Sequence, residues 1–178
     1  MKNRKTVVVA FLLVAVMLLG VGYAALADEL ELGGTVAVKV EDVSDAFEAD
    51  IYFSKVISGD GCEATIHDAA NGDKNDGGTI TVKANAIKEV GGEVIATYTI
   101  KNDNDLPIVI TKPTLANALL TNTNTTYFDV YVNWVNDTMT VAANSTADVV
   151  VTVKLIKTPT SEQAATFTIT FNAAVGTP

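Results

Sequence analysis

Five segments of the chain alternate between apolar and polar residues, and this period of two is the strongest constraint on the fold. In 166–173, for example, Phe167, Ile169 and Phe171 alternate with threonines. Successive side chains of a strand point to opposite faces, so each segment predicts a strand with one buried face and one wet face. The five segments are 79–86, 93–101, 127–135, 147–156 and 166–173. Shorter candidates are 51–57, 63–67, 106–111 and 138–142.

The residues between these segments favour turns. Gly91-Gly92, Asn136-Asp137 and Asn144-Ser145 separate consecutive segments, and such residues adopt positive φ or hydrogen-bond their own backbone. About ten short strands joined by polar turns predict one all-β domain, an antiparallel, jelly-roll-like β-sandwich. We also expect short helices at 42–49 and 114–120, and a helix start at 160–164.

The first residues have the three parts of a secretory signal. Lys2, Arg4 and Lys5 precede an apolar run from Val7 to Val21, and small residues follow it. That run has 15 residues, shorter than the ~20 that span a bilayer as a helix. Residues 1–24 are therefore expected to be a signal helix that contacts the membrane only before cleavage.

Composition excludes several classes of protein. Without residues 1–24 the chain keeps 154 residues, nine of its twelve Lys and Arg, and all 21 acidic residues, a formal net charge of −12. So acidic a chain is a poor ligand for nucleic acid, whose phosphates attract clustered cations. A single cysteine, Cys62, rules out a disulfide scaffold. Val, Ile and Thr supply 51 of the 154 residues, which argues for a folded β-domain rather than disorder.

The mature N-terminus has an unusually long alternation, with apolar residues on even positions from Leu30 to Val40. Gly33-Gly34 is expected to divide it into an outer segment, 25–32, and an inner one, 35–41. One interpretation is a first strand paired within its own sheet. The other is that residues 25–34 form an arm ahead of a sandwich at 35–178. Such an arm adds as a donor strand to the sheet of a neighbouring copy, with Ala25, Leu26, Leu30 and Leu32 in the donor segment.

A resemblance to a known family rests on two stretches. Gly20-Val21-Gly22-Tyr23-Ala24-Ala25-Leu26-Ala27-Asp28 followed by Leu32-Gly33-Gly34-Thr35-Val36-Ala37-Val38 resembles the start of TasA- and camelysin-like secreted proteins. Residues 140–147, 158–163 and 167–171 are similar to short members of that group. Leu26 stands where the family usually has an aromatic residue.

The resemblance implies export by a SipW-like signal peptidase and assembly into extracellular matrix fibres through an N-terminal donor strand. The family pattern places cleavage after Ala24, with Gly22 at the −3 position. A generic peptidase would cut after Ala27, with Ala25 at that position. Both sites remain open at this point.

Catalytic residue sets are missing from the sequence. A zinc protease helix needs two histidines four residues apart, and this chain has only His67. His67 and Cys62 lie five apart in an expected strand, so their side chains point to opposite faces. We expect a surface or edge histidine, a small buried cysteine and no enzyme activity.

The acidic loop 68–78 is the one candidate for a metal. Asn71, Asp73, Asn75 and Asp76 offer oxygen ligands of the kind that calcium binds, but their spacing is not that of an EF-hand. A solvated loop is the favoured interpretation, and no other cofactor is expected. Three sequons, at Asn124, Asn136 and Asn144, fit surface glycosylation but are common by chance in a chain rich in Asn and Thr.

These observations lead to one functional hypothesis and one alternative. We expect a secreted structural subunit that polymerises with copies of itself into surface or matrix fibres. The alternative is a monomeric cell-surface binding or adhesion module, with recognition by loops such as 68–78 and 102–107. A peptidase is the third and least favoured possibility.

Overall fold

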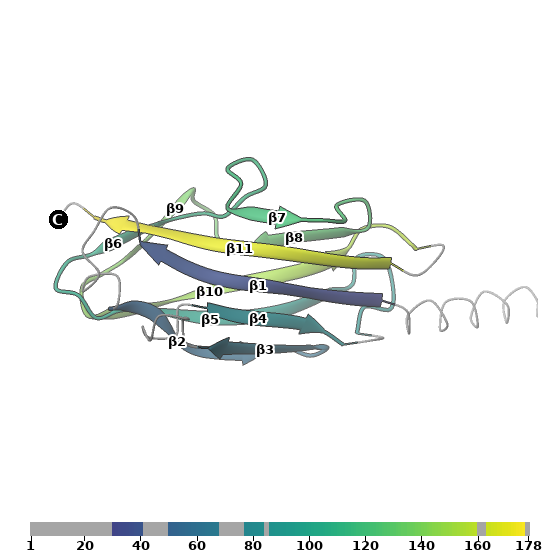
Figure 1. Cartoon of the computed structure of the whole chain (residues 1–178), viewed down its shortest axis with the longest axis horizontal. Helices are drawn as coiled ribbons and strands as arrows, with labels where there is room; N and C mark the ends of the chain where they lie inside the picture. The colour runs from purple at the N-terminus through teal and green to yellow at the C-terminus, as the bar shows by residue number, and fades with distance from the viewer. Residues whose placement is uncertain (1–29, 41–49, 68–76, 84–85, 160–162, 177–178) are drawn as a thin grey trace, which may run out of the picture.

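The protein is a β-sandwich of two packed sheets, as the alternation predicts (Figure 1). The computed structural model describes residues 30–40, 50–67, 77–83, 86–159 and 163–176. Strands and turns make up these residues, with no helix among them and therefore no membrane-spanning helix in this part of the chain. The signal segment and the helix expected at 42–49 lie outside the described residues.

The larger sheet has seven strands in the order β3-β4-β1-β11-β6-β9, and β7 also pairs with β11. The first and last of the described strands therefore lie side by side in its middle, where Figure 1 shows β1 and β11 as two long neighbouring arrows. The bounds are β1 Leu30–Val40, β3 Cys62–His67, β4 Gly77–Val82, β6 Ile108–Thr111, β7 Leu120–Asn122, β9 Thr138–Val141 and β11 Gln163–Val175.

The smaller sheet has four strands in the order β2-β5-β10-β8. Their bounds are β2 Ile51–Ser58, β5 Glu93–Asn102, β8 Phe128–Val132 and β10 Ser145–Leu155. All of its strand pairs are antiparallel, with a register shift between Phe53 and Lys55 where β2 meets β5.

One pair departs from the expected antiparallel arrangement. β1 runs parallel to β11 over its whole length, from Leu30 beside Gln163 to Val40 beside Ala173. Parallel neighbours need a long connection, and here nearly the whole chain lies between them. Periodicity does not report strand direction, so the sequence held no signal for this pair.

The core lies between the sheets and consists of the apolar side chains that the alternation places on one face. Phe167, Ile169 and Phe171 of β11 are buried, as are Val149, Val151, Val153 and Leu155 of β10. Aromatic rings meet at its centre, where Phe53 lies 5.0 Å from Tyr98 and 6.3 Å from Phe171 between ring centroids. Burying each large apolar side chain stabilises the fold by about 1.5–3 kcal/mol.

The prediction of a helix at 114–120 is wrong. Those residues form a turn that leads into the short strand β7, which the alternation did not predict. The Asn117 side chain stabilises the turn, because its Oδ1 accepts from the amides of Thr114 and Leu119 and its Nδ2 donates to the carbonyl of Lys112. Asparagine competes for backbone groups in this way and so disfavours a helix.

Two further boundaries differ from expectation. Of the helix start expected at 160–164, residues 160–162 lie outside the described residues, and Gln163 and Ala164 belong to β11, where they pair with the first residues of β1. Gly33-Gly34 does not interrupt β1, which is one continuous strand from Leu30 to Val40.

Candidate functional site

The first strand occupies a slot in the middle of the larger sheet. Its backbone pairs with β4 on one side, from Leu32 to Ala37, and with β11 on the other. Leu32, Val36 and Val38 point into the core and are 1–3 % exposed. Without β1, two strand edges and part of the core would be open, so this segment completes the sheet.

Two adjacent glycines of β1 differ in the space that surrounds them. A Cβ on Gly34 would lie 2.1–2.3 Å from three atoms of the Phe167 ring, which packs against this position on the core side. A Cβ on Gly33 would meet nothing nearer than the Ile80 carbonyl oxygen at 3.8 Å. Gly34 is therefore required by the core, whereas Gly33 leaves a hollow on the outside.

The middle of the outer face of the larger sheet is rich in threonines. The register places Thr65, Thr79, Thr35, Thr168 and Thr121 in one row across five strands. The Oγ1 atoms of Thr65 and Thr79 lie 2.8 Å apart, and those of Thr35 and Thr168 3.4 Å apart. We call this surface the threonine face and define it by Thr35, Thr65, Thr79, Thr81, Thr121, Thr166, Thr168 and Thr170.

The Gly33 hollow lies on the threonine face. It has a volume of about 320 Å³ and lies between Thr79 and Thr81 on one side and Thr166 and Thr168 on the other. Its floor is the backbone of Gly33 and Gly34. Its walls carry hydroxyl and methyl groups and no charged group.

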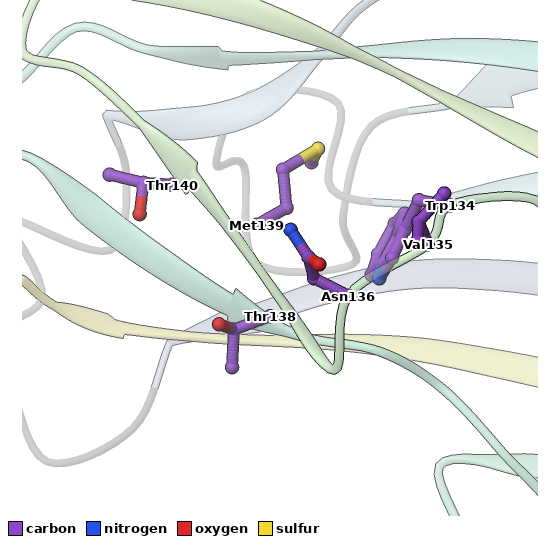
Figure 2. Close-up of a pocket in the computed structure, with 6 residues that line it drawn as sticks. All are labelled: Trp134, Val135, Asn136, Thr138, Met139 and Thr140. Atoms are coloured by element: carbon purple, nitrogen blue, oxygen red, sulfur yellow. The ribbon is translucent and has the colours of Figure 1, made fainter.

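A second hollow lies at the turn between β8 and β9. It has a volume of about 450 Å³, and Figure 2 shows Asn136 and Met139 on the side of β9 that faces Trp134, with Thr138 and Thr140 on the other side. The Trp134 ring packs against Phe171 with 5.9 Å between centroids, and its buried Nε1 has no hydrogen-bond partner among the described residues. Val135 beside it is 97 % exposed.

Two buried titratable groups, Tyr98 of the smaller sheet and Cys62 of the larger sheet, have structural partners. Tyr98 reaches across the sandwich from β5, and its hydroxyl donates to the carbonyls of Thr79 at 3.0 Å and Thr65 at 3.4 Å. Burial raises the pKa of the Tyr98 phenol, which therefore stays neutral. Burial also raises the pKa of the Cys62 thiol, which donates to the carbonyl of Ile95 at 3.3 Å. A buried thiol of raised pKa is a poor nucleophile.

The expectations for Cys62 and His67 are confirmed. Cys62 is buried and His67 exposed on the edge strand β3, with their side chains on opposite faces. The described residues contain no group of three or more His, Cys, Asp or Glu that would hold a metal ion. The calcium candidates Asn71, Asp73, Asn75 and Asp76 lie outside the described residues, so calcium binding stays a prediction.

The donor-segment residues divide between two parts of the chain. Leu30 and Leu32 belong to β1, where Leu30 pairs with Gln163 and Leu32 with both Ala165 and Val82. Ala25 and Leu26 lie outside the described residues, as do Gly22, Ala24 and Ala27 of the cleavage sites. In this single chain the described part of the segment lies in its own sheet.

Asn102 is an anchoring residue that the sequence did not reveal. It stands in a run of turn-forming residues, Asn102-Asp103-Asn104-Asp105, yet its side chain is fully buried. Its Nδ2 donates to the carbonyls of Leu106 at 2.8 Å and Ala142 at 3.1 Å, and its Oδ1 accepts from the amide of Asn104. The end of the β5 alternation was the only signal for its inward orientation.

Comparisons of the chain with models of known protein families and with curated proteins found no match. The functional argument therefore depends on the geometry of β1 and of the surfaces around it.

Proposed function

We propose that this protein is a secreted structural subunit of extracellular fibres and that β1 is the strand exchanged between copies. The observation that carries the proposal is the position of β1, which comes first in the described chain yet fills the middle of a sheet, between β4 and β11. A neighbouring copy that donates its own β1 makes the same main-chain hydrogen bonds and buries the same three apolar side chains. The signal-like start of the chain accounts for export.

The connection to the rest of the chain allows such an exchange. Residues 41–50 separate β1 from β2, and ten extended residues span at most about 33–36 Å. That reach is comparable to the length of β1 itself, about 36 Å for eleven residues. A copy can thus place its β1 in the next molecule while its remaining strands stay together.

Exchange of β1 favours a fibre over a closed dimer when each copy donates to one neighbour and accepts from another. Such a head-to-tail contact does not close on itself and continues as a filament. The donor in this proposal is the whole of β1, which includes Leu30 and Leu32, and the segment before it extends the arm.

Engineered disulfides can distinguish a β1 that lies in the sheet of a neighbouring copy from a β1 that lies in the sheet of its own chain. Thr35 and Thr168 face each other between β1 and β11, and neighbouring strands are about 4.8 Å apart, within the range of a disulfide. We would introduce Thr35→Cys and Thr168→Cys into a Cys62→Ala chain that begins at Ala25. The matched control is Thr65→Cys with Thr79→Cys, because β3 and β4 are consecutive strands of the core domain.

The chains are assembled in reductant, oxidised, and analysed by non-reducing electrophoresis and electron microscopy. We expect a covalent ladder from the Thr35–Thr168 pair and monomers from the control pair. Oxidation before assembly should lock β1 in its own sheet and prevent fibres. Fibres whose Thr35–Thr168 disulfides are all within single chains would refute the exchange.

The alternative function is a monomeric binding module. The hollow at Trp134 favours it, because its lining combines the exposed apolar side chain of Val135 with the polar side chains of Asn136 and Thr138. This alternative predicts a monomer at every concentration in analytical ultracentrifugation, with β1 always in its own sheet.

A further inference from the structure

We infer that the threonine face is a lateral contact surface at which copies of this chain, held in neighbouring fibres, pack face to face. This inference rests on the proposed function and deepens it. The partner that packs against the threonine face is the threonine face of a second copy.

Copies of this chain repel each other over most of their surface. The mature chain carries a formal charge of −12, and two such molecules approach closely only where charge is missing. Eight outward positions in β4, β1 and β11 carry no charged side chain: Thr81, Gly33 and Thr166 in one row, Thr79, Thr35 and Thr168 in the next, and Ala37 and Thr170 in a third, where the His67 ring covers Gly77. Glu63 of β3 lies at the margin of the first row, next to Thr81. This is a surface at which like-charged copies can meet.

The shape of the face suits a copy of itself. Its side chains are short and regularly spaced, about 4.8 Å across strands and about 6.7 Å along them, as packed sheets require. The Gly33 hollow is open to the outside, since even a Cβ there would meet only the Ile80 carbonyl at 3.8 Å. A threonine of the opposite copy fits this space, with its methyl group buried and its hydroxyl near Thr81 or Thr166.

The area indicates a weak contact that becomes effective through repetition. Three rows across three strands cover roughly 14 Å by 20 Å, or about 560 Å² for the two faces together. Stable complexes bury about 1,200–2,000 Å², so two free monomers should stay apart. Filaments or other arrays add many such contacts, and the sum holds them together.

The test compares one charge on each outer face. Thr168→Asp places a carboxylate at the centre of the threonine face, opposite the same carboxylate of the other copy. The control, Thr146→Asp, adds the same charge at an exposed position of β10 on the outer face of the smaller sheet, beside Lys101. Circular dichroism and thermal unfolding establish that both variants are folded.

Two readouts separate this inference from the fibre proposal. In electron microscopy, fibres of the wild type and of Thr146→Asp should associate into bundles, whereas fibres of Thr168→Asp should remain single. Streptavidin beads that carry each chain through a C-terminal biotin should cluster for wild type and control and stay dispersed for Thr168→Asp. Clustering of the Thr168→Asp beads should return in 1 M salt, because screening reduces the Debye length to about 3 Å.

Each outcome decides between the two ideas. Single wild-type fibres together with dispersed wild-type beads would overturn the lateral contact and leave strand exchange intact. Bead clustering that disappears with Thr168→Asp, without fibres from any chain, would support the contact and count against the fibre. Equal clustering by wild type and Thr168→Asp would overturn the inference, because another surface would then be responsible.

Discussion

The two outer faces of the sandwich have the same alternation but different chemistry. The central positions of the threonine face are Thr, Gly and Ala, whereas the smaller sheet exposes Glu93, Lys101, Asp129, Asp148 and Lys154. There Lys154 pairs with Glu93 at 2.7 Å and Lys101 with Asp103 at 2.8 Å. The Thr99 hydroxyl donates to Asp148 at 2.6 Å.

The difference in charge between the two outer faces indicates where one acidic molecule can bind another copy of itself. Both faces are wet, so periodicity alone does not separate them. The centre of the larger sheet's outer surface, around β1, is uncharged, with Lys39 and Glu63 exposed at its margin, whereas the smaller sheet carries the paired charges. A strand from a second acidic chain therefore meets less repulsion in the larger sheet.

The largest effect on stability is expected at Gly34, on the core side of β1. Gly34→Ala places a Cβ within 2.1–2.3 Å of the Phe167 ring, so the ring must move. Overpacking of this kind costs about 1–3 kcal/mol of the free energy of unfolding. Denaturant unfolding of the monomer measures the loss.

The neighbouring substitution is the control. Gly33→Ala meets open space and a negative φ, so it should stabilise the chain by about 0.4–1 kcal/mol through the unfolded state. Equal effects of the two substitutions would show that Phe167 does not constrain β1.

A smaller effect on stability is expected from the hydrogen bonds by which Tyr98 of the smaller sheet contacts the larger sheet. Tyr98→Phe removes the hydroxyl that donates to the Thr79 and Thr65 carbonyls beneath the threonine face. One such hydrogen bond contributes about 0.5–1.5 kcal/mol. Tyr131→Phe on the exposed charged face, where the hydroxyl lies 3.4 Å from Glu93, should change stability less.

The same substitution tests the pKa of Tyr98. Because burial raises this pKa in the folded state, its contribution is complete below the unfolded value of about 10 and decreases as the pH rises above it. Wild type should therefore lose more stability than Tyr98→Phe between about pH 9 and pH 11. Parallel pH profiles would contradict this assignment.

The smallest effect is expected on the charged face. The hydrogen bond from Lys154 lowers the pKa of Glu93, so the stabilisation is present above the ordinary glutamate pKa of about 4.3 and is lost as the pH falls through the folded value. Both groups are exposed, so Lys154→Met should barely change the melting temperature. It should raise the pKa of Glu93 in an NMR titration, whereas Lys101→Met should not.

Much of the fold follows from local pattern. The alternation placed Tyr98, Val151 and Phe171 in the core, and the odd spacing of Cys62 and His67 placed their side chains on opposite faces. The turn around Asn117 and the burial of Asn102 did not follow, because asparagine is typical of turns whether its side chain faces solvent or the interior.

The sequence by itself determined which side of most strands is buried, because successive side chains of a strand always point to opposite faces. Only the tertiary structure decided that β1 lies parallel to β11 and that threonines from five strands align in one row. Register and strand order depend on packing between residues far apart in the chain, such as Gly34 and Phe167. No local pattern encodes those contacts.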